Sequence, residues 1–498
     1  MSARPARARA AAPALLLLAL GASAFAWRTV PSAYFVSDDF LYLFDIVNLP
    51  PLELLLAPHG GHVLAVRNAV FLLFARLFGT APLPFYLAVL LTHLLNVALL
   101  FALLRRVVPP PAAAAFGALL FGTAPLLAAT LTWYSVYGQV LATTAMLLVL
   151  LIAARAAARD GRLRRGETAA AAALLLAGAF SFGVGLGLAL VAPLCLALLL
   201  PRRGTRRPPL LALWVAIPLL YVASHAAYDR VAQHPRVSGV AALTALAALM
   251  PAAWSQVLGM GVDLVGYGTA RLLGGPLPLD YGAPRLWHGA ALALTALSAW
   301  AAWRGGPTAR RWLLALWLCL IGCYGSIAMG RFALWNALPA AVEQTRYHYA
   351  GAALLALLLA VAVVQLPAIT AARLAFPLWL GAAALGFALW PPAVDTNAAA
   401  RAEAALVIGQ VRARVAAAPP GAAVRIPNRV FHAVGAPLVS LLEFPGWAAV
   451  FAIYFPANRV QGHPVTFVEP SAAVRAQFAD GRRTAGLLVA PEDAPATP

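Results

Sequence analysis

Long apolar runs separated by short loops recur from the N-terminus to about residue 390. This pattern restricts the possible folds of the chain to very few. A transmembrane helix needs about 20 predominantly apolar residues, and eleven of the runs approach that length. Hydrophobic residues make up 62% of the 498 positions and charged residues 11%, whereas a soluble domain carries about 25% charge. The sequence therefore predicts an all-α polytopic membrane protein.

The loops between the runs alternate in charge, which predicts the orientation. Basic residues cluster at 4–9, 105–106, 155–165 and 202–207, and basic loops stay in the cytoplasm. The net charge of +19 thus reports membrane orientation, and no nucleic-acid partner is expected. The first run is read as a retained span. The expected spans are 11–27, 85–104, 112–131, 140–154, 169–179, 183–200, 210–225, 286–303, 312–329, 348–366 and 374–390.

Two further apolar segments are not counted as crossings. Residues 62–78 contain two arginines, an asparagine and a histidine, which predicts an interfacial helix over the outer mouth of the bundle. Residues 240–267 are interrupted by Pro251, Gln256 and Asp263, which predicts a periplasmic or re-entrant helix. With this topology eight acidic residues lie outside and two lie in cytoplasmic loops. The polar working face is therefore expected on the periplasmic side.

The composition changes after Trp390, where the apolar runs end. Residues 398–417 have helical spacing, and 423–426, 465–469 and 485–490 are typical of short strands. We expect a transmembrane domain at 1–391 and a small periplasmic α/β domain at 392–498. The three cysteines lie inside apolar runs, so neither a disulfide framework nor a zinc site is expected.

Asp38 and Asp39 lie about a dozen residues after the first span. Carboxylates beside a span are costly unless they accept protons, bind a cation or meet a polar substrate. Adjacent carboxylates that share a site also raise each other's proton affinity, which suits a general base. The alternative is a pair of solvated loop acids, one of which caps a helix.

Arg331 and Arg346 stand near the outer ends of two late spans, and Arg346 is followed by Tyr347 and His348. A guanidinium group is always charged and matches phosphate oxygens. Its partner in this position is an acidic side chain, a lipid phosphate or the phosphate of a lipid-linked substrate.

His59 and His62 are close enough in sequence to share a divalent metal ion with Asp38 or Asp39, although hydrogen-bonding loop histidines are the commoner case. His93 and Asn96 share one face of the second span, which favours hydrogen bonds between helices. The aromatic residues of the loop that begins at Trp133 form an interfacial belt or stack on sugar rings.

These features together resemble the GT-C class of integral-membrane glycosyltransferases, and within it the protein O-mannosyltransferases and their bacterial relatives. The resemblance covers roughly residues 10–390 and rests on Asp38-Asp39, the amphipathic segment with Arg67, the span with His93 and Asn96, the Trp133 loop and the run from Arg346 to Tyr349. It implies a polyprenyl-phosphate sugar donor, an acceptor at the outer face and inversion at the sugar carbon. Many members carry Asp-Glu where this chain has Asp-Asp, and residues 392–498 have no counterpart.

The resemblance implies that Asp38 or Asp39 is the base or binds a metal and that Arg346 contacts the donor phosphate. Our hypothesis adds Arg331 as a second phosphate ligand and places His62, Arg67, Tyr347 and His348 in the substrate cavity. The expected location is the bacterial inner membrane with a periplasmic active site. Two alternatives remain: a lipid or polysaccharide transporter, and a non-catalytic envelope assembly protein.

Overall fold

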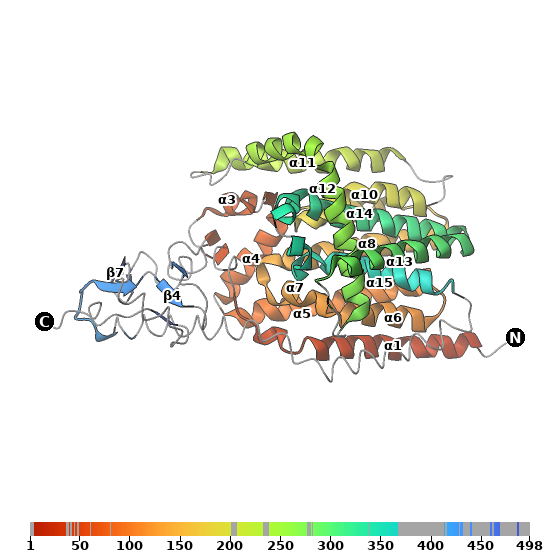
Figure 1. Ribbon diagram of the computed structural model, residues 1–498, viewed down its shortest axis with the longest axis horizontal. Coiled ribbons are helices and arrows are strands. Elements are labelled where there is room, and N and C mark those ends of the chain that lie inside the picture. The colour runs from red at the N-terminus through yellow and green to blue at the C-terminus, as the bar shows by residue number, and fades with distance from the viewer. Residues whose placement is uncertain are drawn as a thin grey trace.

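The chain forms a bundle of α-helices, seen in a computed structural model (Figure 1). The structure describes residues 4–35, 39, 42–43, 45–46, 49–59, 61–79, 81–200, 207–232, 239–275, 280, 282–337, 339–366 and short pieces between 413 and 487. Its α-helices are α1 (Arg4–Ala26), α3 (Pro51–Leu56), α4 (Ala65–Phe78), α5 (Pro82–Val107), α6 (Pro111–Gly122), α7 (Ala128–Thr132), α8 (Tyr137–Arg159), α9 (Arg165–Ala179), α10 (Gly183–Leu199), α11 (Arg207–Val231), α12 (Gly239–Gly274), α13 (Pro284–Arg304), α14 (Pro307–Ala337) and α15 (Tyr349–Val363).

Four described helical segments are long and apolar enough to cross a membrane: 12–32, 82–107, 134–159 and 307–332. They match four of the expected spans, and they confirm an all-α membrane protein. Helices α10 and α15 are also apolar but shorter, with 17 and 15 residues. The last expected span, 374–390, lies outside the described residues.

The expected span 112–131 is broken into α6 and α7, which meet at an angle of 46°. Pro125 explains the break, because proline has no backbone N–H and disfavours helical geometry in the residue before it. A 3-10 turn (Pro125–Leu127) joins the two helices. The bend brings the Ala129 backbone N–H to Thr345 Oγ1, at 3.3 Å, and so docks α7 on a 3-10 turn late in the chain (Thr345–Tyr347).

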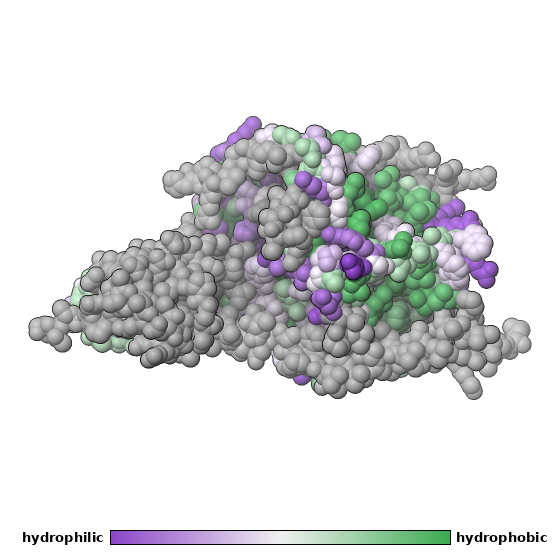
Figure 2. Space-filling model, viewed as in Figure 1, coloured by the Kyte–Doolittle hydropathy of each residue, from purple (hydrophilic) through white to green (hydrophobic). Residues whose placement is uncertain are grey.

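The interfacial helix begins later than the sequence predicts, at Ala65, because a two-stranded hairpin of β1 (Pro58–His59) and β2 (His62–Val63) precedes it. Helix α4 buries Arg67 and Asn68 while leaving Leu73 and Leu77 more than half exposed. This inverted polarity is expected of a helix that meets lipid on its outer side. Figure 2 likewise shows hydrophobic side chains gathered on the surface of the helical bundle.

A buried polar cluster joins four helices at the centre of the bundle. The Tyr349 hydroxyl on α15 lies 2.9 Å from His93 Nδ1 and 3.2 Å from Asn96 Nδ2, both on α5. His93 Nε2 lies 3.0 Å from the Gly122 carbonyl on α6, and Thr144 Oγ1 on α8 donates to Asn96 Oδ1 at 2.7 Å. These contacts confirm the predicted role of His93 and Asn96 in joining helices.

Helix α12 is the largest departure from the predicted secondary structure. It covers the helical segment expected at 240–267 and extends beyond it to 36 residues, with Pro251 inside the helix, and it packs against α11, α13, α14 and α15. Its glycines permit this packing, because a Cβ atom on Gly266 would meet the Trp287 carbonyl oxygen of α13 at 2.2 Å. Small residues at such crossings are typical of helices that associate within membranes.

The described pieces of the C-terminal region include six short strands, which lie beyond the helical bundle (Figure 1). One sheet has the order β3 (Val424–Pro427), β7 (His463–Val468), β6 (Arg459–Val460), and the other has the order β5 (Val439–Ser440), β4 (Arg429–Phe431), β8 (Gly486–Leu487). Strands β3, β7 and β8 overlap the three strands that the sequence predicts. Most of the expected helix at 398–417 lies outside the described residues.

Candidate functional site

A polar cavity of about 190 Å³ lies where several elements converge. The β1–β2 hairpin contributes His59 and His62, and the segment from a further 3-10 turn (Tyr134–Val136) into α8 contributes Ser135 and Gln139. The N-terminus of α10, the late part of α14 and the turn before α15 complete the wall. Segments from both halves of the chain therefore build one site.

Two guanidinium groups line this cavity, one from Arg331 on α14 and one from Arg346 on the turn before α15. The Cζ atom of Arg346 lies 5.0 Å from the ring centre of Trp133 and 5.3 Å from that of Tyr347. Within the described part of the chain, neither arginine has a carboxylate within salt-bridge distance. The cavity thus carries positive charge that an anionic ligand would neutralise.

Three cavity-lining side chains also hold buried polar atoms that have no hydrogen-bond partner among the described residues. They are the Trp133 indole N–H, the Tyr347 hydroxyl and the Gln139 side-chain carbonyl oxygen. A buried polar group without a partner costs about 1–3 kcal/mol. The side chains that line the cavity therefore include two donors and one acceptor that no described residue satisfies.

His62 lines the cavity from β2, directly across the hairpin from His59. Its Nδ1 atom lies 3.1 Å from the hydroxyl of Tyr221 on α11. The pKa of His62 is lowered from 6.5 to about 4, mainly by burial and additionally by the charges of the nearby Arg331, His225 and His59. The ring is therefore neutral at physiological pH.

We expect this histidine to make the folded protein sensitive to acid. The unfolded chain binds a proton near pH 6.5 and the folded chain only near pH 4, so stability falls as the pH falls through that window. Between about pH 7.5 and about pH 5 the wild type should lose about 2 kcal/mol more than His62→Gln. Thermal unfolding of both proteins in detergent at the two pH values measures the difference. Equal losses would contradict the prediction.

Asp39 lies behind the cavity wall and is fully buried. Its Oδ1 atom accepts hydrogen bonds from both the backbone N–H and the hydroxyl of Ser135, each at 2.5 Å, and Tyr86 Oη lies 3.3 Å from Oδ2. Ser135 itself lines the cavity. The Asp39 carboxylate therefore fixes the turn that forms one wall, while Asp38 lies outside the described residues.

Arg67 holds the same turn from the other side. Its side chain is 1% exposed, and one guanidinium nitrogen donates to the Ser135 carbonyl oxygen at 3.1 Å while another donates to Asn68 Oδ1 at 2.6 Å. Its Cζ atom stacks 3.5 Å from the ring centre of Tyr42, another cavity-lining residue. Arg67 thus supports the wall from behind and does not line the cavity.

The structure brings most of the predicted site residues together. Arg331, Arg346, Tyr347, His62 and His59 all line the one cavity. His348 does not line it, because both ring nitrogens are engaged inside the bundle. His348 Nδ1 lies 2.9 Å from the Tyr324 hydroxyl, and Nε2 lies 2.7 Å from the Val342 carbonyl oxygen.

A metal site from Asp38, Asp39 and His59 is not formed within the described residues. There, no group of three or more histidine, cysteine or acidic side chains is placed to hold a metal ion. Asp38 lies outside them, so the predicted divalent-cation site stays a prediction.

Sequence reasoning missed Ser135 and Gln139 as cavity-lining residues and Tyr221 as the partner of His62. Gln139 stands at the start of an apolar helix beside an aromatic loop, and a polar residue in that position was the available signal. Tyr221 carries no such signal, because tyrosine is common at the ends of spans.

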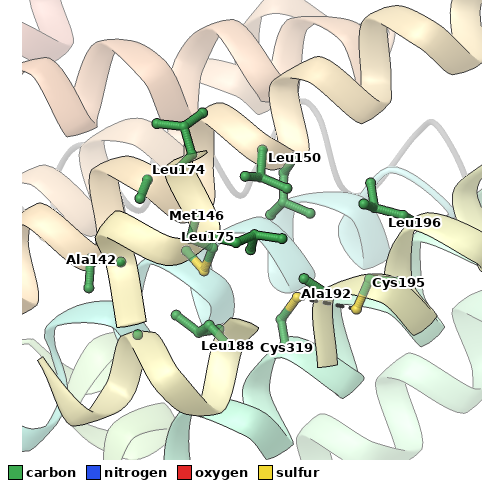
Figure 3. Close-up of a pocket in the computed structure, with 14 residues that line it drawn as sticks. Ala142, Met146, Leu150, Leu174, Leu175, Leu188, Ala192, Cys195, Leu196 and Cys319 are labelled. Carbon is green, nitrogen blue, oxygen red and sulfur yellow. Dashed lines mark hydrogen bonds between the residues drawn. The ribbon is translucent and has the colours of Figure 1, made fainter. Parts of the chain in front are cut away.

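A second cavity lies between α8, α9, α10 and α14 (Figure 3). Its volume is about 20 Å³, and leucine, alanine, methionine and cysteine side chains line most of it. Cys195 Sγ and Cys319 Sγ are 3.5 Å apart at its edge, and both thiols are free. It is a small gap in apolar packing, and Cys319 contributes to that packing.

Comparisons of the chain with protein-family models, with characterised proteins and with solved structures gave no match.

Proposed function

We propose that the protein is a membrane glycosyltransferase that moves a sugar from a polyprenyl-phosphate donor to an acceptor at the periplasmic face. The observation that carries the proposal is the cavity in which Arg331 and Arg346 lack carboxylate partners among the described residues. A lipid phosphate would supply the missing negative charge. The unpartnered polar atoms of Trp133, Gln139 and Tyr347 would then meet sugar hydroxyl groups.

The proposed chemistry needs a base and a stabilised leaving group. A carboxylate takes the proton of the acceptor hydroxyl as that oxygen attacks the sugar carbon, and the bond to the donor phosphate breaks on the opposite face. Positive charge at the phosphate stabilises the departing oxygen. Arg331 and Arg346 take the second role. We assign the first role to Asp38, because the hydrogen bonds of Asp39 to Ser135 favour a positioning role for Asp39.

The proposal includes a membrane topology. The protein would cross the bacterial inner membrane eleven times, with the cavity open to the periplasm and residues 392–498 forming a small periplasmic α/β domain. The alternating basic loops support this orientation. A divalent cation at Asp38 is compatible with the proposal, although the described residues do not require one.

The test is a sugar-transfer assay with membranes that contain the full chain. A panel of radiolabelled polyprenyl-phosphate sugars is added, and the loss of each donor and the appearance of label in another product are measured. We expect one donor to be consumed with release of polyprenyl phosphate. Membranes without the protein are the control, and consumption of no donor in the panel would contradict the proposal.

The same assay separates the two rival functions. A transporter would carry the labelled lipid across the bilayer of a proteoliposome while the sugar stays attached to it. An assembly protein would neither move nor cleave the donor.

A further inference from the structure

The His62 ring has one nitrogen engaged by the protein and one that faces the cavity. His62 Nδ1 shares a hydrogen bond of 3.1 Å with Tyr221 Oη, and no described residue forms a hydrogen bond with Nε2. Two glycines leave room around Nε2: a Cβ atom on Gly183 would come within 2.7 Å of it, and one on Gly330 would lie 4.0 Å away. Arg331 follows Gly330 directly and lines the same cavity. Nε2 is therefore open to a ligand beside a guanidinium group.

The hydrogen bond to Tyr221 decides which nitrogen carries the proton. Tyr221 is 4% exposed, and His62 Nδ1 is the only side-chain hydrogen-bond partner of its hydroxyl among the described residues. If Nδ1 carried the proton and donated it, the buried phenolic proton of Tyr221 would lack an acceptor among the described residues. If Tyr221 donates to Nδ1, both the hydroxyl proton and Nδ1 have a partner. The neutral ring then carries its proton on Nε2, toward the cavity.

We propose that His62 Nε2–H and the Arg331 guanidinium form a donor-only site for an anionic phosphate oxygen, and that Tyr221, outside the cavity, is the positioning residue that fixes this tautomer. The ligand class rests on the proposed function, whereas the tautomer does not. In this site His62 is a hydrogen-bond donor and not the base. A phosphate oxygen only accepts hydrogen bonds, so it suits a site made of His62 Nε2–H and the Arg331 guanidinium. A neutral hydroxyl group in its place would form no ion pair with Arg331.

Two substitutions of His62 test the assignment, because their amide groups occupy different halves of the ring. The glutamine amide reaches the position of Nε2 and the asparagine amide that of Nδ1. Binding of farnesyl phosphate to the full chain in phosphatidylcholine nanodiscs is measured, with farnesol as the ligand that lacks phosphate. We expect His62→Gln to bind within about threefold of the wild type and His62→Asn to bind about 10-fold or more weakly, as for loss of a hydrogen bond to a charged group.

Nitrogen-15 NMR of histidine-labelled protein reports which nitrogen of the His62 ring carries the proton. A purely structural role of Tyr221 would not change this signal. We expect the His62 signals, identified by their absence in His62→Gln, to show a protonated Nε2 and an unprotonated Nδ1. Tyr221→Phe should shift them toward a mixture of tautomers and weaken farnesyl phosphate binding, while farnesol binding stays unchanged.

Three results would overturn the inference in different ways. A proton on Nδ1 in the wild type would refute the tautomer. Equal binding of farnesyl phosphate by the wild type and His62→Asn would refute the anion site alone. Failure of the wild type to bind farnesyl phosphate more tightly than farnesol would refute the anion site together with the lipid-phosphate donor.

Discussion

Replacing Arg346 with alanine is expected to lower kcat/KM for sugar transfer by about 100-fold, and Arg331→Ala should have an effect of similar size. Each guanidinium faces the cavity without a carboxylate partner among the described residues, so its charge is available to the donor phosphate. Arg346→Lys should recover part of the loss, because lysine keeps the charge but not the two-pronged geometry of arginine. Initial rates at several donor concentrations measure these effects.

The fold should survive the Arg346 substitution, which keeps the experiment interpretable. The Arg346 backbone carbonyl oxygen, not its side chain, accepts hydrogen bonds from Gln139 and Thr130. Its side chain contributes two ring contacts, worth about 0.5–1 kcal/mol each. The matched control is Arg304→Ala, which removes an exposed arginine from the end of α13. If Arg346→Ala and Arg304→Ala transfer sugar equally well, the phosphate assignment is wrong.

The sequence predicts the class of protein well because lipid imposes one dominant constraint. Apolar runs long enough to cross a bilayer become helices, and α5, α8 and α14 cover their expected ranges. The inward-facing polar pair of α5, His93 and Asn96, could also be predicted, because polar groups in lipid must find partners on other helices.

The direction in which neighbouring side chains point could not be predicted. Successive residues of a helix differ by about 100° around its axis. In the turn before α15, Arg346 and Tyr347 reach the cavity, whereas His348 is turned into the bundle against Tyr324. Asp39 poses the same problem, since only the fold shows that its carboxylate is buried against Ser135. The end of α12 could not be predicted either, because the helix continues past residue 267, where the expected segment ends, to Gly274.

The two aspartates should therefore respond differently to substitution. Asp38→Asn is expected to lower the rate of transfer by about 10²- to 10⁴-fold, the range for loss of a general base. Its thermal stability should stay close to that of the wild type. Asp280→Asn, which changes an exposed acid on the predicted outer face, is the matched control and should retain full activity.

Asp39→Ala is expected to act through stability instead. It removes the acceptor of two hydrogen bonds from Ser135 and leaves a buried backbone N–H without a partner, at a cost of about 3 kcal/mol. Arg67 would still hold the Ser135 carbonyl oxygen, so the turn should loosen without unfolding. Asp39→Asn keeps one carbonyl oxygen to accept from Ser135 and should recover part of both stability and activity. The opposite pattern would be a stable but inactive Asp39→Asn and an active Asp38→Asn. That result would show that Asp39 is the base and that it is not a positioning residue.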